Sequence, residues 1–108
     1  MAKPVRLRRE AANDIDTALD YYLAEAGVEV AQRFVTAVER ATVSIGRTSR
    51  SGSLRFAYDL EIPDLRCWPL TRFPYLVFYV EHADHIDVWR LLHTRRDLPA
   101  TLADNNEA

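Results

Sequence analysis

The sequence predicts an α+β fold in which one N-terminal strand, an antiparallel helical hairpin and a three-stranded antiparallel meander follow one another in the order β-α-α-β-β-β. In the first half of the chain apolar residues recur at the spacing of a helix. In the second half they gather in short runs separated by turn-forming residues. Tight connections make these runs an antiparallel meander. Helices packed on one face of one small sheet bury the apolar sides of both.

Apolar residues in the N-terminal half recur with two different spacings, one typical of a strand and one typical of a helix. Alternation of apolar residues with arginines predicts a short strand over residues 4–8. An apolar stripe that steps by four and three residues predicts a helix from about residue 9 to 26, and Gly27 is a suitable residue to end it. A second stripe predicts another helix that begins almost at once and ends near Gly46. Because the connection is so short, the two helices form an antiparallel hairpin.

Most of the bulky β-forming side chains lie in the second half. Strands are expected over residues 65–70, 75–81 and 86–92, and the middle one is apolar on both faces, as in a central strand. Residues 47–53 are predicted to be a loop from their composition. Residues 54–62 are also predicted to be a loop, although their alternation is compatible with extended structure.

These elements leave the second face of the predicted sheet uncovered. Trp68 and Trp89, with their neighbours on the same side, would then be partly exposed. An exposed apolar patch on a small protein usually marks a partner. The sequence therefore predicts a binding surface on the sheet face that carries the two tryptophans.

Composition and charge limit the class of protein. The chain fits one globular domain spanning residues 1–108, with a polar tail from about residue 103 that is expected to fray. A net charge of −2 gives no general attraction to nucleic acid or to a membrane. No apolar run could span a membrane, and no signal peptide is visible. The single cysteine fits a cytoplasmic location. The cysteine and histidine spacings match no common zinc pattern, so neither a metal nor a cofactor is expected.

Three blocks of sequence resemble the RelE/ParE superfamily of bacterial toxins, and its ParE branch most closely. The first pairs Asp14-Ile15 in the first helix with residues 31–34 (AQRF) in the second. The other two blocks are Trp68-Pro69 followed by residues 73–79 (FPYLVFY), and residues 92–97 (LHTRRD). The resemblance covers nearly the whole chain.

One departure from the family pattern lies after the second helix. Many relatives carry Pro-x-x-Gly there. This chain keeps the glycine as Gly52 but has Ser49 at the proline position. The departure bears on the rigidity of that loop.

The resemblance implies the toxin of a type II toxin–antitoxin pair, held inactive by a ParD-like antitoxin whose C-terminal segment wraps it. Free ParE-like toxins poison DNA gyrase, a topoisomerase, whereas RelE-like relatives cut messenger RNA on the ribosome. Operator DNA would be contacted only through the toxin–antitoxin complex, which can form higher-order oligomers. Because both branches share the fold, the site must distinguish them.

The chemistry of RNA cleavage favours the ParE-like reading. Cleavage needs an acid–base pair and cations that hold the phosphate. The predicted central strand has no lysine or arginine, and no tyrosine follows the last strand. A nuclease would have to rely on His93, Arg95 and Arg96, and His93 is interpreted first as a structural residue at a strand end. A protein inhibitor is therefore favoured over an enzyme. A ribosome-dependent endonuclease and a binding module without toxicity are the alternatives.

Two sets of candidate site residues follow. The candidates for target recognition lie in the loop between two expected strands or at and after the end of the last one, and are Arg72, His93, Arg95, Arg96 and Asp97. The candidates for antitoxin binding are apolar or aromatic residues of the meander, namely Trp68, Leu70, Phe73, Tyr75, Trp89 and Leu91.

Overall fold

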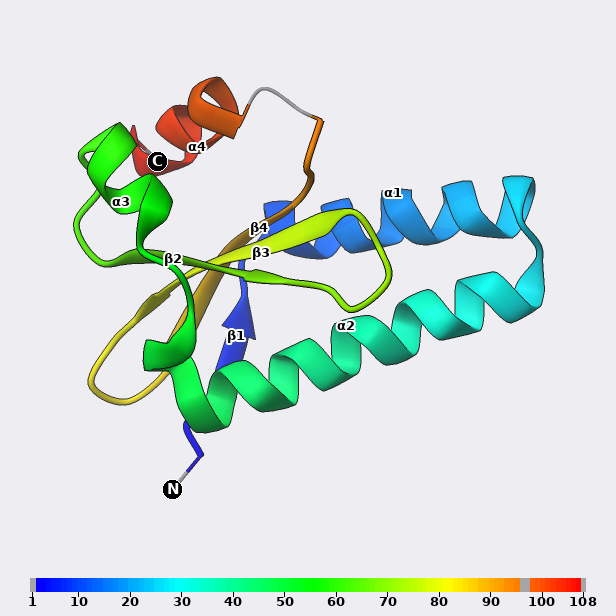
Figure 1. Ribbon diagram of the computed structural model, residues 1–108, viewed down its shortest axis with the longest axis horizontal. Coiled ribbons are helices and arrows are strands. Elements are labelled where there is room, and N and C mark those ends of the chain that lie inside the picture. The colour runs from blue at the N-terminus through cyan, green and yellow to red at the C-terminus, as the bar shows by residue number, and fades with distance from the viewer. Residues whose placement is uncertain (1, 96–97, 108) are drawn as a thin grey trace.

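The computed structural model describes residues 2–95 and 98–107, and within them four strands form one sheet (Figure 1). The strands are β1 (Val5–Leu7), β2 (Leu65–Pro69), β3 (Tyr75–Glu81) and β4 (Ile86–His93), in the spatial order β1-β4-β3-β2. β1 runs parallel to β4, whereas β2, β3 and β4 form the expected antiparallel meander. The predicted α+β class and strand order are confirmed, and β3 is a central strand.

The helical hairpin consists of α1 (Arg9–Glu25) and α2 (Val28–Thr48) and covers one face of the sheet (Figure 1). Gly27, with a φ of 94°, connects the two helices in a conformation that favours glycine. The second helix does not end at Gly46. That glycine lies inside α2, where a Cβ atom would come within 3.0 Å of the backbone oxygen of Lys3. Gly46 therefore permits close approach of the segment before β1.

Two further helices and a short 3₁₀ turn correct the prediction for the remaining segments. The turn η1 (Ser49–Ser51) and α3 (Arg55–Leu60) occupy the stretch expected to be loop, and α4 (Leu98–Glu107) replaces the expected frayed tail up to Glu107. α3 is too short for a helical stripe to stand out against the alternation of its apolar residues. Both helices pack on the second face of the sheet (Figure 1).

The expectation of an uncovered second face, with both tryptophans on it, is wrong. Trp89 packs there with Phe56 of α3 and Leu98 of α4, and is only 7% exposed. Trp68 lies on the other face, toward the hairpin. The strand pairing passes from Phe78–Arg90 to Tyr79–Val88, so Trp89 is the extra residue of a β-bulge.

An ion pair fixes the hairpin to the sheet. The carboxylate of Asp14 in α1 accepts hydrogen bonds from Arg90 Nε at 2.6 Å and Nη2 at 2.8 Å. It also accepts one from the backbone N–H of Leu91 at 3.1 Å. Both side chains are nearly buried, with exposed fractions of 11% for Asp14 and 15% for Arg90. The hydrogen bond that Arg90 donates to the Asp14 carboxylate raises the pKa of Arg90 above its ordinary value. This pair links the middle of α1 to the site of the bulge.

Hydrogen bonds stabilise the segment after α2, where Ser49 departs from the expected family pattern. Ser49 is buried, and its hydroxyl donates to Glu81 at 2.6 Å. Its backbone oxygen accepts from the hydroxyl of Tyr79 at 2.5 Å. Burial raises the pKa of Tyr79 to about 12, which keeps this donor protonated. Lys3 also donates to Glu81, at 2.9 Å. The segment is thus held by side-chain contacts with β3, without a proline ring.

Replacing Asp14 tests the ion pair. Asp14→Ala leaves the Arg90 charge nearly buried without its carboxylate, so we expect a loss of about 3 kcal/mol in the free energy of unfolding, measured with urea. Asp16→Ala removes an exposed carboxylate from the same helix and should change that free energy by less than about 0.5 kcal/mol. Equal losses in the two variants would show that the Asp14 contacts contribute nothing specific.

Acid titration tests the Glu81 contacts. Hydrogen bonds from Ser49 and then Lys3 hold the pKa of Glu81 below its ordinary value. A lowered pKa adds stability that is complete above the unfolded value, about 4.3, and is lost as the pH falls through the folded value. Between about pH 6 and pH 3, wild type should therefore lose more stability than Glu81→Gln. Ser49→Ala should lie between them, and superimposable wild-type and Glu81→Gln curves would contradict the assignment.

Candidate functional site

A cluster of rings joins the hairpin to the ends of β3 and β4. Its members come from α1, α2, the β2–β3 loop and both strands, and are Tyr22, Phe34, Phe73, Tyr75 and His93. Ring centroids lie 5.2 Å apart for Tyr22 and Phe73, 5.4 Å for Phe34 and Phe73, and 5.2 Å for Tyr75 and His93. Edge-to-face contacts of this kind favour one arrangement of the rings. Burial, followed by the nearby Tyr75, raises the pKa of Tyr22. The cluster therefore holds the β2–β3 loop against both helices.

His93 has a structural partner on each side. Its ring packs edge-on against Tyr75, and its Nδ1 accepts a hydrogen bond from the backbone N–H of Arg95 at 3.1 Å. This bond places the proton of a neutral ring on Nε2. Arg95 itself is exposed. The other two candidates from this block, Arg96 and Asp97, lie outside the described residues.

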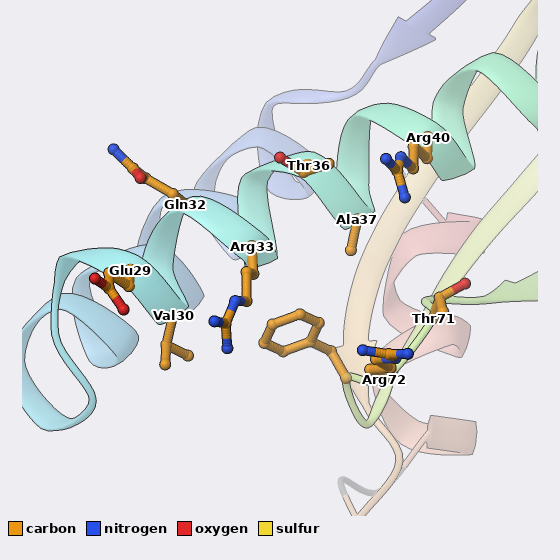
Figure 2. A pocket seen from close by; sticks show the side chains of 10 residues that line it. Glu29, Val30, Gln32, Arg33, Thr36, Ala37, Arg40, Thr71 and Arg72 are labelled. Atoms are coloured by element: carbon orange, nitrogen blue, oxygen red, sulfur yellow. The ribbon is translucent and has the colours of Figure 1, made fainter.

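A groove of about 1040 Å³ lies between α2 and the β2–β3 loop (Figure 2). Its lining residues are Glu29, Val30, Gln32, Arg33, Thr36, Ala37, Arg40, Thr71, Arg72 and Phe73. In Figure 2, Arg33 and Ala37 point from α2 toward the side on which Thr71 and Arg72 lie, and Gln32 points away. Ala37 and Phe73 are half-buried, whereas the arginines are exposed. The groove thus has an apolar floor and a cationic rim.

The rim carries three arginines without a described partner: Arg33, Arg40 and Arg72. In the part of the chain that the structure describes, no side-chain hydrogen bond, ion pair or ring contact links any of them to another residue. Arg33 and Arg40 are seven residues apart on α2, so they lie on one face of the helix about 10 Å apart along its axis. The groove can therefore bind anionic groups at Arg33 and Arg40 along α2, and at Arg72 on the loop across from the helix.

Sequence reasoning identified Arg72 and Phe73 but missed Arg33 and Arg40. Both missed arginines fall off the apolar stripe of α2, where an arginine is usually only a solvated charge. Their seven-residue spacing was the one available signal. That spacing indicates a binding site only once the structure shows that the loop carrying Arg72 lies across the groove from α2.

The backbone of Arg72 is in the left-handed region, with a φ of 68°. Few residues other than glycine adopt this conformation, because the Cβ atom crowds the following carbonyl oxygen. Strain of this kind persists where the surrounding structure imposes it, and it often accompanies functional sites. Here the conformation places an arginine at the rim of the groove where glycine would be easier to accommodate.

The structure divides the antitoxin-binding candidates into two groups. Trp68, Phe73 and Tyr75 are half-buried and keep some exposed surface. The other candidates are buried, with exposed fractions of 5% for Leu70, 7% for Trp89 and 3% for Leu91. The expected exposure of Trp89 is therefore wrong, since α3 and α4 cover it. Phe73 lines the groove beside Arg72, so one candidate from each predicted set lies at the same place.

Other polar clusters do not assemble a metal site or a reactive thiol. His82 and His85 stack with ring centroids 4.7 Å apart at the β3–β4 turn. Within the described residues no three His, Cys, Asp or Glu side chains are grouped to hold a metal. Burial raises the pKa of Cys67, which disfavours its thiolate form. Among the helices of the described ranges, none is both long enough and apolar enough to cross a bilayer.

A glycine substitution tests the strain at Arg72. Arg72→Gly should raise the free energy of unfolding by about 1 kcal/mol, because glycine adopts a positive φ without the Cβ clash. Arg72→Ala removes the same charge but keeps the Cβ atom, so its unfolding in urea should stay close to wild type. If alanine stabilises as much as glycine does, charge repulsion in the groove accounts for the gain and backbone strain does not.

Comparison with known proteins agrees with this architecture. The family model described as "ParE toxin of type II toxin-antitoxin system, parDE" matches residues 5–98. No curated protein matches the sequence. A solved structure titled "Chromosomal ParDE TA system from P. aeruginosa" superimposes with a TM-score of 0.71 and 21% identity, over 85% of this chain and 96% of that chain. At this identity the structural likeness supports the fold, and the family model establishes the relationship. The chain therefore belongs to the ParE family, the toxins of type II toxin–antitoxin pairs of the parDE kind.

Proposed function

We propose that this toxin inhibits DNA gyrase when it is free, and that its ParD-type antitoxin prevents this by covering the end of the molecule that carries the groove. One observation carries the proposal. Arg72, a candidate for target recognition, and Phe73, a candidate for antitoxin binding, line the same groove. An antitoxin segment seated on Phe73 would bury Arg72 as well. Neutralisation would then be competition for one surface.

The target-facing part of this surface runs from Arg72 on the β2–β3 loop to the end of β4 and does not include the α2 side of the groove. The ring cluster connects Phe73 through Phe34 and then Tyr75 to His93, and Arg95 follows with an exposed side chain. In this proposal His93 positions the chain at the strand end, and Arg72 and Arg95 supply exposed cations for contact with gyrase. Trp68 remains a candidate contact for the antitoxin at the outer strand of the sheet. Operator DNA would be reached only through the toxin–antitoxin complex.

A ribonuclease is supported less well by the same residues. β3 carries no lysine or arginine to hold a phosphate. The Nδ1 atom of His93 already accepts the Arg95 N–H, which leaves only Nε2 for proton transfer. A protein inhibitor needs no such acid–base pair. A site of action in the bacterial cytoplasm follows from gyrase as the target, and the single cysteine fits that compartment.

A supercoiling assay with purified gyrase tests the proposal. The toxin should inhibit supercoiling, and adding the antitoxin should restore it. Arg95→Ala should weaken inhibition about fivefold or more, because it removes an exposed cation at the proposed contact. Arg47→Ala removes an exposed arginine at the far end of α2 and should leave inhibition unchanged.

A parallel assay uses ribosome-bound messenger RNA with the same preparations. Cleavage of the message with supercoiling untouched would replace the proposal with the RelE-like alternative. Activity in neither assay would identify the chain as a binding module without toxicity.

A further inference from the structure

We infer that the groove between α2 and the β2–β3 loop receives an acidic, partly apolar helical segment of the antitoxin. The segment carries two carboxylates separated by two helical turns, an apolar side chain between them and a basic residue beyond one end. This inference rests on the ParD-type partner of the proposed function and adds the chemistry by which that partner is recognised.

The spacing of the cations defines the spacing of the carboxylates. Arg33 and Arg40 are separated by two turns of α2, with Ala37 between them on the same side. A helix lying alongside α2 would present carboxylates seven residues apart at the same separation. Guanidinium groups form paired hydrogen bonds with carboxylates, which gives such a contact geometric specificity. The small side chain of Ala37 lets the partner's apolar residue approach the floor beside Phe73.

The charges along the groove also set the direction of the segment. Glu29 lies in the first turn of α2 and, among the residues that the structure describes, is the one acidic residue that lines the groove. Arg33 and Arg40 follow it along the helix, and Arg72 lies across from them on the loop (Figure 2). A partner segment that placed its acidic residues opposite Glu29 would meet repulsion. Its basic residue therefore lies at the Glu29 end, and its acidic residues lie opposite Arg33 and Arg40, with Arg72 across the groove from them.

An apolar hollow that adjoins the groove along α2 favours a protein as the occupant. This hollow of about 500 Å³ shares Gln32 and Thr36 with the groove and is otherwise lined by Leu19, Leu23, Val28, Ala31 and Val35. Val28 is 62% exposed and Leu23 45%, although both are apolar. A polypeptide can bury this surface while it pairs with the arginines next to it. A nucleic acid gains little from apolar surface, and the net charge of −2 does not attract one.

Charge reversal in the groove tests the inference. The probe is the toxin's full-length ParD-type antitoxin, titrated calorimetrically into the purified toxin. Arg33→Glu/Arg40→Glu should weaken binding by about tenfold or more, and the affinity should depend less on salt between about 100 and 400 mM. Arg47→Glu makes the same change on an exposed arginine of α2 outside the groove and should stay within about twofold of wild type. Matching melting temperatures would show that all variants fold.

A complementary change in the antitoxin sharpens the test. Replacing two of its acidic residues, seven positions apart in a helical segment, by arginine should weaken binding to wild type and restore binding to the doubly reversed toxin. Unchanged affinity of Arg33→Glu/Arg40→Glu for the antitoxin overturns the inference. The inference is also overturned if Arg33→Glu/Arg40→Glu loses affinity for a single-stranded oligonucleotide and keeps its affinity for the antitoxin. That result would assign the groove to nucleic acid.

The gyrase assay separates failure of this inference from failure of the proposed function. The doubly reversed toxin keeps Arg72 and Arg95, so it should still inhibit supercoiling and should escape neutralisation by wild-type antitoxin. Normal neutralisation of an active variant would overturn the groove assignment alone. Absence of inhibition by wild-type toxin would overturn the proposed function, and the binding titration would still report on the groove.

Discussion

The contact of Asp14 with β4 determines how the helical hairpin lies on the sheet. One carboxylate binds the Arg90 side chain and the Leu91 backbone, at the point where the bulge at Trp89 interrupts the strand pairing. Beside this bulge, Trp89 and Leu91 pack on opposite faces of the sheet, and the Arg90 side chain reaches Asp14 of α1. A nearly buried ion pair contributes to a specific arrangement when its hydrogen bonds are complete, as they are here. The position of α1 in turn sets the position of α2.

The groove is a consequence of that placement. Once the ring cluster holds the β2–β3 loop against both helices, the loop lies beside α2 and completes a concave surface. The residues on its rim do little for the stability of the free toxin. Arg72 adopts a conformation that suits glycine better, and the nearby arginines repel one another without a described carboxylate between them. Such features are retained where a partner supplies the compensating interactions.

The position of the groove explains how an antitoxin could neutralise the toxin. In the proposed function, the surface that contacts the target extends from Arg72 to Arg95, and the antitoxin covers its Arg72 end. Phe73 belongs both to the groove and to the ring cluster, so ring contacts through Phe34 and Tyr75 connect the groove to His93. The second face of the sheet takes no part in this proposal, since α3 and α4 already bury it.

The sequence by itself determined the hairpin, the meander and the family, because these depend on long periodic stripes and on contiguous blocks of residues. It also brought forward Arg72 and Phe73 within the candidate site. Only the tertiary structure decided the rest. α3 has six residues, too few to display a helical period, and α4 is held by burying Leu98 and Leu102 against distant strands. The bulge at Trp89 depends on pairing between strands. The groove depends on a loop approaching a helix far away in the chain, which no local pattern in either segment records.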